Sequence, residues 1–223
     1  RDIASMHNVF KKYYHNCDFD TFKKDLNKKD AAILVRRKDT NDIVGFTTVM
    51  KFEINVNNKK AYAFFSGDTI IEKEFWGSTA LHFAAIRHAV TEKIKSFWTP
   101  LYWFLITKGY KTYLLLANNL TTYYPRYDKP FDPHMKSVLD ACCMKMYPEN
   151  YHRETGLLEF GDNYQKLKSD VAPISEKLKI TYPKIAYFEY VNPNWRDGVE
   201  LPTIGKVSLP MIFTKSGKFI LKI

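Results

Sequence analysis

The sequence predicts a single mixed α/β domain with a mostly antiparallel sheet flanked by helices. Three apolar segments between residues 31 and 71 are separated by the turns "KDTND" and "NVNNKK", which is the pattern of an antiparallel meander. A helical pattern over about residues 78–98 follows the third segment. A strand reached through such a crossover runs parallel to the strand before it. No linker, repeat or composition break divides the chain, so we expect one domain over residues 1–223.

The first half of the chain gives the clearest periodicities. Apolar residues recur at helical spacing over residues 3–14, and a second short helix is expected to open near Asp20. "AAILVRR", "IVGFTTVMKFEI" and "AYAFFSGDTII" are the three expected strands. Their alternating apolar positions predict that one face of this meander is buried.

The second half is less regular. "LYWFLITKG" is predicted to be helical and to stop at Gly109, and "TYLLLA" is predicted to be the buried parallel strand. Residues 134–147 are expected to form a helix, and residues 148–184 show no clear period. "KIAYFEYVN", "KVSLPMIF" and "KFILKI" are expected to be strands that complete or extend the sheet. The aromatic run "FWTPLYWFLI" fits either core or the wall of an acyl channel.

Composition restricts the class of protein. Lys and Arg number 34 against 24 Asp and Glu, and the net charge of +10 favours an anionic partner or a solvated basic surface. The three cysteines have neither disulfide nor zinc spacing, which favours reduced thiols and a cytoplasmic protein without a metal. His82 and His88 lie six residues apart, a spacing that does not form a metal pair on a helix. No apolar run reaches the ~20 residues of a membrane span.

Two segments together resemble the GCN5-related N-acyltransferase (GNAT) superfamily. They are "SGDTIIEKEFWGSTAL" and "TYLLLANNLTTYY", and the predicted order of strands and helices supports them. The resemblance covers about residues 5–130. It implies a sheet with a central V-shaped splay, and it implies transfer of an acyl group from a thioester to an amine.

The resemblance also implies where the acyl donor binds. The donor would be acyl-CoA or the acyl-phosphopantetheine of an acyl carrier protein. The strand before the glycine corner would bind the pantetheine arm, and the amides of the following helix would bind the pyrophosphate. The departures from the family loop are Glu74 and a single glycine, which leave room for a carrier-protein donor. The expected donor-binding residues are Thr69, Ile70, Ile71, Trp76, Gly77, Ser78, Thr79, Ala80 and Asn118.

Catalytic roles follow from the same resemblance. Asn118 or Asn119 would approach the thioester, and Tyr123 or Tyr124 would protonate the leaving thiolate. Asp68, beside Gly67 in the third strand, is the candidate general base. Each tyrosine also fits a packed aromatic, Asp68 fits a strand aspartate bonded to backbone, and the glycine corner fits an ordinary strand-to-helix turn.

Two classes of function therefore remain. The first is an N-acyltransferase whose partners are an acyl donor and an amine acceptor, with no stable nucleic-acid partner and no membrane span. The second is a nonenzymatic basic module that binds anions or nucleic acid. Because the resembled fold has a strand before its first helix, we also expect residues upstream of Arg1 or a missing first strand.

Overall fold

A computed structural model describes residues 2–76, 78–161, 164–168, 171 and 173–208. The helices, with two short 3-10 turns labelled η, are α1 Asp2–Tyr13, α2 Phe19–Leu26, η1 Lys73–Phe75, α3 Ala80–Lys95, α4 Tyr110–Asn119, α5 Pro133–Met146, α6 Glu176–Thr181, α7 Pro183–Val191 and η2 Trp195–Asp197. The strands are β1 Ala31–Arg36, β2 Ile43–Val56, β3 Lys59–Ile71, β4 Leu101–Thr107, β5 Tyr123–Tyr124, β6 Tyr151–His152, β7 Leu157–Leu158 and β8 Leu201–Val207.

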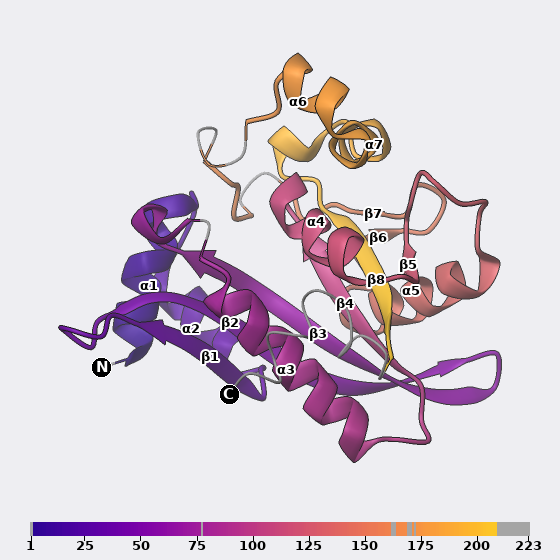
Figure 1. Ribbon diagram of the computed structural model, residues 1–223, viewed down its shortest axis with the longest axis horizontal. Helices are drawn as coiled ribbons and strands as arrows, with labels where there is room; N and C mark the ends of the chain where they lie inside the picture. Colours follow the sequence, from indigo (N-terminus) through magenta and orange to yellow (C-terminus); the bar gives the residue numbers. More distant parts are fainter. Residues whose placement is uncertain (1, 77, 162–163, 169–170, 172, 209–223) are drawn as a thin grey trace.

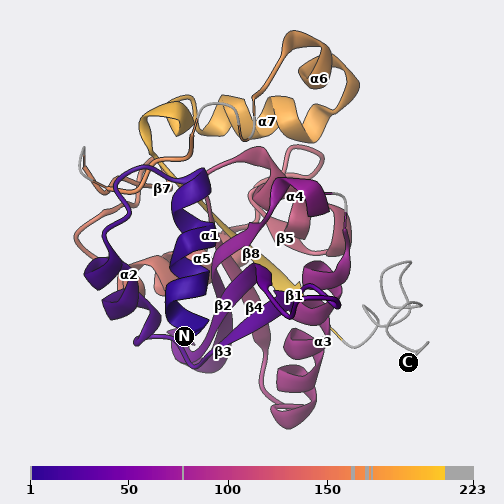
Figure 2. The ribbon, with the colours of Figure 1, turned by 90° about the vertical axis from the view of Figure 1, so that its left-hand side faces the viewer.

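The described residues form a six-stranded sheet with helices on both faces. Its strand order is β1-β2-β3-β4-β8-β5, and β6 and β7 form a separate small pair. Within this sheet β3 and β4 run parallel, and the other neighbours are antiparallel. The helices α1, α2 and α5 cover one face, and α3 and α4 cover the other, with α7 packed against α4 (Figures 1 and 2). The predicted mixed α/β fold with a mostly antiparallel sheet is confirmed.

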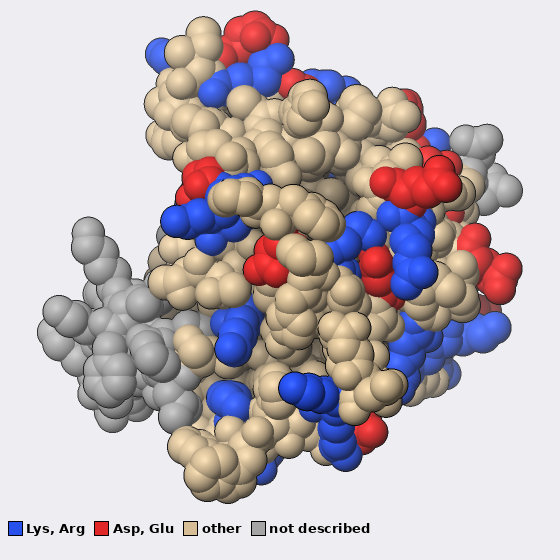
Figure 3. Space-filling view, turned by 90° about the vertical axis from the view of Figure 1, so that its right-hand side faces the viewer, with Lys and Arg blue, Asp and Glu red and all other residues tan. Residues whose placement is uncertain are grey.

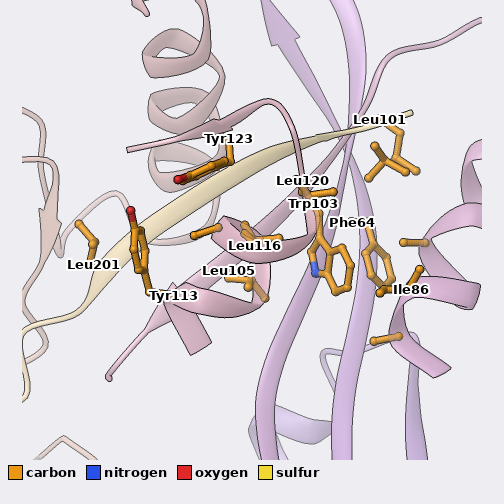
Figure 4. Close-up of a cluster of buried hydrophobic side chains, with 14 of the residues drawn as sticks. Phe64, Ile86, Leu101, Trp103, Leu105, Tyr113, Leu116, Leu120, Tyr123 and Leu201 are labelled. Carbon is orange, nitrogen blue, oxygen red and sulfur yellow. The ribbon is translucent and has the colours of Figure 1, made fainter. Parts of the chain in front are cut away.

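The parallel pair at the centre of the sheet is buried on both faces. Phe64 pairs with Trp103 and faces α3, whereas the next residues, Phe65 and Phe104, pair with each other and face α5. None of these four side chains is more than 2% exposed. Figure 4 shows Phe64 and Trp103 side by side against Ile86 of α3. Alternation of side chains along a strand therefore divides the aromatic residues of this pair between two cores.

The same pair separates before its strands end. Register between β3 and β4 stops at Ser66 and Leu105, although β3 continues to residue 71 and β4 to residue 107. Beyond this point β3 stays paired with β2, and β4 stays paired with β8. The sheet thus splits into two halves, which is the expected V-shaped splay.

A β-bulge lies at the start of the splay. Thr47 of β2 pairs with Thr69 of β3, and Val49 of β2 pairs with Ser66 of β3. An interval of three residues on β3 therefore lies opposite an interval of two residues on β2. The extra residue falls in the Gly67-Asp68 dipeptide and turns the strand. An added Cβ at Gly67 would lie 2.5 Å from the Thr48 hydroxyl oxygen, so this bulge requires a glycine.

Six predicted elements match the structure closely. The two N-terminal helices, the three strands of the meander and the helix expected over residues 134–147 correspond to α1, α2, β1, β2, β3 and α5. The helix expected over about residues 78–98 is α3, which is shorter at both ends. Of the apolar residues that recur at helical spacing in this segment, Ile86 and Val90 are buried, whereas Ile94 and Phe97 are about half exposed.

The helix predicted for "LYWFLITKG" is wrong, because this segment is the strand β4. The strand has a continuous apolar run since β3 and β8 flank it and cores cover both of its faces. A short apolar run of this kind has no period that separates a buried strand from a buried helix. Gly109 is the N-cap of α4 and does not end a helix.

The strands predicted for "TYLLLA" and "KIAYFEYVN" are wrong as well, because these segments lie in the helices α4 and α7. Tyr113 and Leu116 of α4 are buried three residues apart, as are Ile185 and Phe188 of α7. The parallel partner of β3 is therefore β4, one element earlier than predicted.

The predicted C-terminal strands are only partly described. The strand β8 begins at Leu201 and ends at Val207, and so begins before the predicted "KVSLPMIF". The rest of that segment and "KFILKI" lie outside the described residues.

Gly205 of β8 provides a test of this packing. It pairs with Trp103 on one side and Tyr123 on the other, and an added Cβ would lie 2.1 Å from Cδ1 of the buried Leu120. We expect Gly205→Ala to lower the free energy of unfolding by about 1–3 kcal/mol. Urea unfolding measures this change, with the exposed Lys206→Ala as the matched control. A Gly205→Ala variant as stable as the wild type would contradict this account of the packing.

Candidate active site

A cavity of about 770 Å³ occupies the splay between β3 and β4. Its lining includes residues 67–71 of β3, and Ile106 and Lys108 at the end of β4. Further lining residues come from α2 on one face of the sheet and from α4 on the other. The cavity therefore passes through the sheet at the point where backbone pairing stops.

Asp68 of the bulge lies in this cavity. Burial first, and then the nearby Asp25, raise the pKa of its carboxyl group to about 6, although Lys108 and Lys29 act to lower it. Its side chain keeps partial contact with solvent, as expected for a group that lines an open cavity. Asp68 is consequently a carboxylate at neutral pH and has a proton affinity higher than that of an ordinary aspartate, which suits a general base.

A buried ion pair lies at the end of β4. The Lys108 Nζ donates to the Glu200 carboxylate at 2.8 Å and to the Gln165 carbonyl oxygen at 3.0 Å. The same ammonium group lies 4.0 Å from the centre of the Tyr164 ring. Glu200 is 2% exposed, so its charge requires this partner. The pair links the end of β4 to the residue before β8 and fixes one wall of the cavity.

Three tyrosines of the cavity have strongly shifted acidities. Burial raises the pKa of Tyr14, Tyr147 and Tyr164 well above the ordinary value for a phenol. Each is therefore a neutral hydroxyl at physiological pH. A neutral hydroxyl in a cavity can donate a hydrogen bond or a proton to a developing anion.

The end of β3 forms the other wall. Thr69, Ile70 and Ile71 line the cavity, and β4 no longer pairs with them. The Trp76 indole nitrogen donates to the Ile71 carbonyl oxygen at 3.0 Å. The Lys111 ammonium of α4 lies 3.9 Å from the centre of the Trp76 ring, and burial lowers its pKa. This wall combines a strand edge, an aromatic ring and a cation.

The predicted phosphate-binding corner lies next to this wall. Ser78, Thr79 and Ala80 are exposed at the start of α3, and they do not line the cavity. Thr79 is the N-cap and makes no capping bond through its side chain. Gly77 lies outside the described residues.

Tyr123, Tyr124, Asn118 and Asn119 are not among the cavity residues. Tyr123 is 4% exposed and lies near Tyr113 in the core shown in Figure 4. Burial raises the pKa of Tyr124 to about 12. These residues lie away from the cavity because "TYLLLA" belongs to helix α4. The segment with Tyr123 and Tyr124 therefore follows a helix and not the parallel strand that the sequence had predicted.

The side-chain amides of the two asparagines form hydrogen bonds with other residues of the protein. The Asn118 side-chain oxygen accepts from Lys184 Nζ at 2.9 Å, and the Asn119 amide donates to the Leu115 carbonyl at 2.8 Å. Both groups lie at the C-terminal end of α4. Lys108 and Lys111 instead flank Gly109 at its N-terminal end, which is the end that lines the cavity.

The sequence analysis missed several cavity residues: Tyr14, Lys108, Lys111, Tyr147, Tyr164 and Glu200. They come from distant parts of the chain and form no local motif. One signal was present, because Lys108 is a charged residue directly after the apolar run of β4. A charge at that position indicates the end of a buried strand.

Charge is mixed over the surface that Figure 3 shows. Lys and Arg side chains are interspersed with Asp and Glu there, and uncharged areas separate them. Among the described residues, no three His, Cys, Asp or Glu side chains form a group that could hold a metal ion. None of the helices in the described ranges has the length and hydropathy of a membrane span.

Comparisons with known proteins add no relative. No protein-family model matches the chain, and a search of curated proteins finds no match.

The raised pKa of Asp68 predicts a pH dependence of the free energy of unfolding. The native state binds this proton more tightly than the unfolded chain, so the contribution of Asp68 to the stability of the wild type should fall as pH rises from about 4 to about 6. Asp68→Asn removes the buried charge and should be more stable than the wild type at pH 8, by about 1–3 kcal/mol. The difference should vanish near pH 4, where both side chains are neutral.

Urea unfolding between pH 4 and pH 8 measures this effect. Asp39→Asn, in an exposed turn, is the matched control for the same chemical change. An Asp68→Asn variant that is less stable than the wild type at pH 8 would show that the carboxylate is stabilised where it lies.

Proposed function

We propose that the protein is an N-acyltransferase that moves an acyl group from a thioester to an amine. The observation that carries this proposal is the cavity that crosses the sheet where β3 and β4 separate, with Asp68 at the bulge. A cavity lined from both faces would allow a donor to bind on one side and an acceptor on the other. Their reacting atoms would then meet between the strands.

The donor would occupy the face that carries α3 and α4. An extended pantetheine arm can bond to the free edge at residues 69–71, because β4 leaves that edge unpaired. Trp76 and Lys111 would flank the arm. The phosphates of acyl-CoA or of a carrier-protein arm would lie toward residues 78–80, where the amides of α3 begin.

The reaction would need no covalent enzyme intermediate. The amine nitrogen attacks the thioester carbonyl carbon, the C–N bond forms and the C–S bond breaks. Asp68, directly or through water, takes the proton that the nitrogen loses. The departing thiolate takes a proton from a neutral hydroxyl, for which Tyr14, Tyr147 and Tyr164 are placed in the cavity. The products are an amide and a free thiol.

The alternative of a nonenzymatic basic module has weaker support. On the face that Figure 3 shows, Lys and Arg side chains are mixed with Asp and Glu and form no basic stripe. The cavity also contains Asp68, a carboxyl group of raised pKa that binding of an anion does not require.

Thiol release from acyl-CoA in the presence of amines tests the reaction. We expect the rate to rise with pH through about 6 as Asp68 loses its proton. Asp68→Asn should lower the rate about 100-fold or more and remove this dependence. Tyr14→Phe, Tyr147→Phe and Tyr164→Phe identify the acid, with Tyr123→Phe and Tyr124→Phe as the comparison outside the cavity. An Asp68→Asn variant of unchanged rate would refute the role of the base.

Donor binding gives an independent test. Calorimetric affinity for acyl-CoA should fall as KCl is raised, since phosphates are attracted by cations such as Lys111. Lys111→Gln should weaken binding by about threefold to tenfold, the effect of one partly exposed charge contact. Lys177→Gln in the exposed part of α6 is the matched control. Affinity that is indifferent to salt and to Lys111 would remove this wall from the donor site.

A further inference from the structure

The helix α2 presents a polar stripe to the cavity. Thr21, Lys24 and Asp25 of α2 line it, together with Lys28 in the turn that follows the helix. The apolar side of α2 is separate, because Phe22 is buried against α1 and β2. A stripe of charged residues toward a cavity serves no core packing.

Charge along this stripe is not balanced. The Lys29 ammonium lies 3.0 Å from the Asp25 carboxylate, and its side chain is only 5% exposed. This ion pair neutralises Asp25. Neither Lys24 nor Lys28 has an ion-pair partner among the described residues. Lys24 and Lys28 are exposed like charges four residues apart, so this wall has an excess positive charge that would attract an anion.

The rest of this half of the cavity differs in character. Tyr147, Phe160 and Tyr164 form an aromatic group. The ring centre of Phe160 lies 5.3 Å from that of Tyr147 and 4.1 Å from that of Tyr164. Asp68 supplies a carboxylate. Asp25, Lys108, Lys29 and Glu200 are the charges that act most on Asp68, so Lys24 and Lys28 are not its main partners. The anion-attracting wall and the candidate base are therefore separate features of one space.

We propose that the amine acceptor carries an anionic group that Lys24 and Lys28 bind, while Asp68 faces its amino group and the aromatic side chains contact its apolar body. Such a molecule is of the amino-acid type, with a carboxylate or a phosphate as the anion. The inference rests on the proposed acyl transfer for the role of the amine. It adds the class of acceptor to that function.

Matched acceptors test the charge requirement. L-phenylalanine, L-phenylalaninamide and 2-phenylethylamine share the amine and the ring, and only the first carries a carboxylate. We expect the KM for phenylalanine to be at least about tenfold lower than for the other two, the effect of a charge-assisted contact. The KM for phosphoethanolamine, compared with that for ethanolamine, tests whether a phosphate is preferred. The carboxylate and phosphate comparisons together identify the anion that binds.

The double variant Lys24→Gln, Lys28→Gln should abolish this preference by raising the KM of the anionic acceptor about tenfold. Its kcat and its affinity for acyl-CoA should stay near those of the wild type. Lys23→Gln is the matched control, because Lys23 is an exposed lysine of the same helix outside the cavity lining. Equal KM values for charged and uncharged acceptors in the wild type would overturn the proposal, as would a double variant that keeps the preference.

Direct binding separates this inference from the proposed function. Calorimetry with phenylalanine and phosphoethanolamine, without a donor, reports the anion site alone. Binding that depends on Lys24 and Lys28 without any thiol release would support the site and refute acyl transfer. Thiol release with no preference for an anionic amine would do the reverse. Neither binding nor release would refute both.

Discussion

The parallel pairing of β3 with β4, and its end at Ser66 and Leu105, is the constraint on which the rest of the structure depends. Up to this point the two strands share buried aromatic residues on both faces, and the Trp103 indole donates to the Ser66 hydroxyl at 2.9 Å in the buried core. Beyond it each strand keeps only its outer neighbour. At residues 69–71 the edge of β3 that faces the gap has no strand partner, and the Trp76 indole nitrogen donates to its Ile71 carbonyl oxygen.

The bulge and the ion pair keep the two halves apart in a defined way. On one side, the extra residue at Gly67-Asp68 turns β3 and places a carboxylate at the opening. On the other, Lys108 and Glu200 tie the end of β4 to β8. Since helices cover both faces, the gap becomes a cavity with walls of different chemistry. A strand edge with Trp76 and Lys111 borders one half, and a charged stripe of α2 with tyrosines borders the other.

This arrangement gives a physical reason for an acyl-transfer proposal that does not depend on a sequence match. Two molecules can reach the same carbon from opposite faces only if the sheet is open between them. The raised pKa values of Asp68 and of the cavity tyrosines are consequences of the same burial. The excess positive charge of Lys24 on α2 and of Lys28 in the turn after it extends the proposal to the acceptor, because an apolar amine would leave both lysines without an anionic partner.

The N-terminal helices, the meander and α5 could be predicted from the sequence, because their periodicities are long and regular. Asp68 became a candidate through the family resemblance, which gives a role to the carboxyl group beside Gly67 in the third strand. That "LYWFLIT" is a strand and "TYLLLA" a helix depends on tertiary packing, because burial on every side removes the period that distinguishes them. As a result, the parallel strand ends next to Lys108 and not next to Asn118, where the sequence had predicted its end. The cavity tyrosines and Glu200 meet only through long-range packing, which no local pattern encodes.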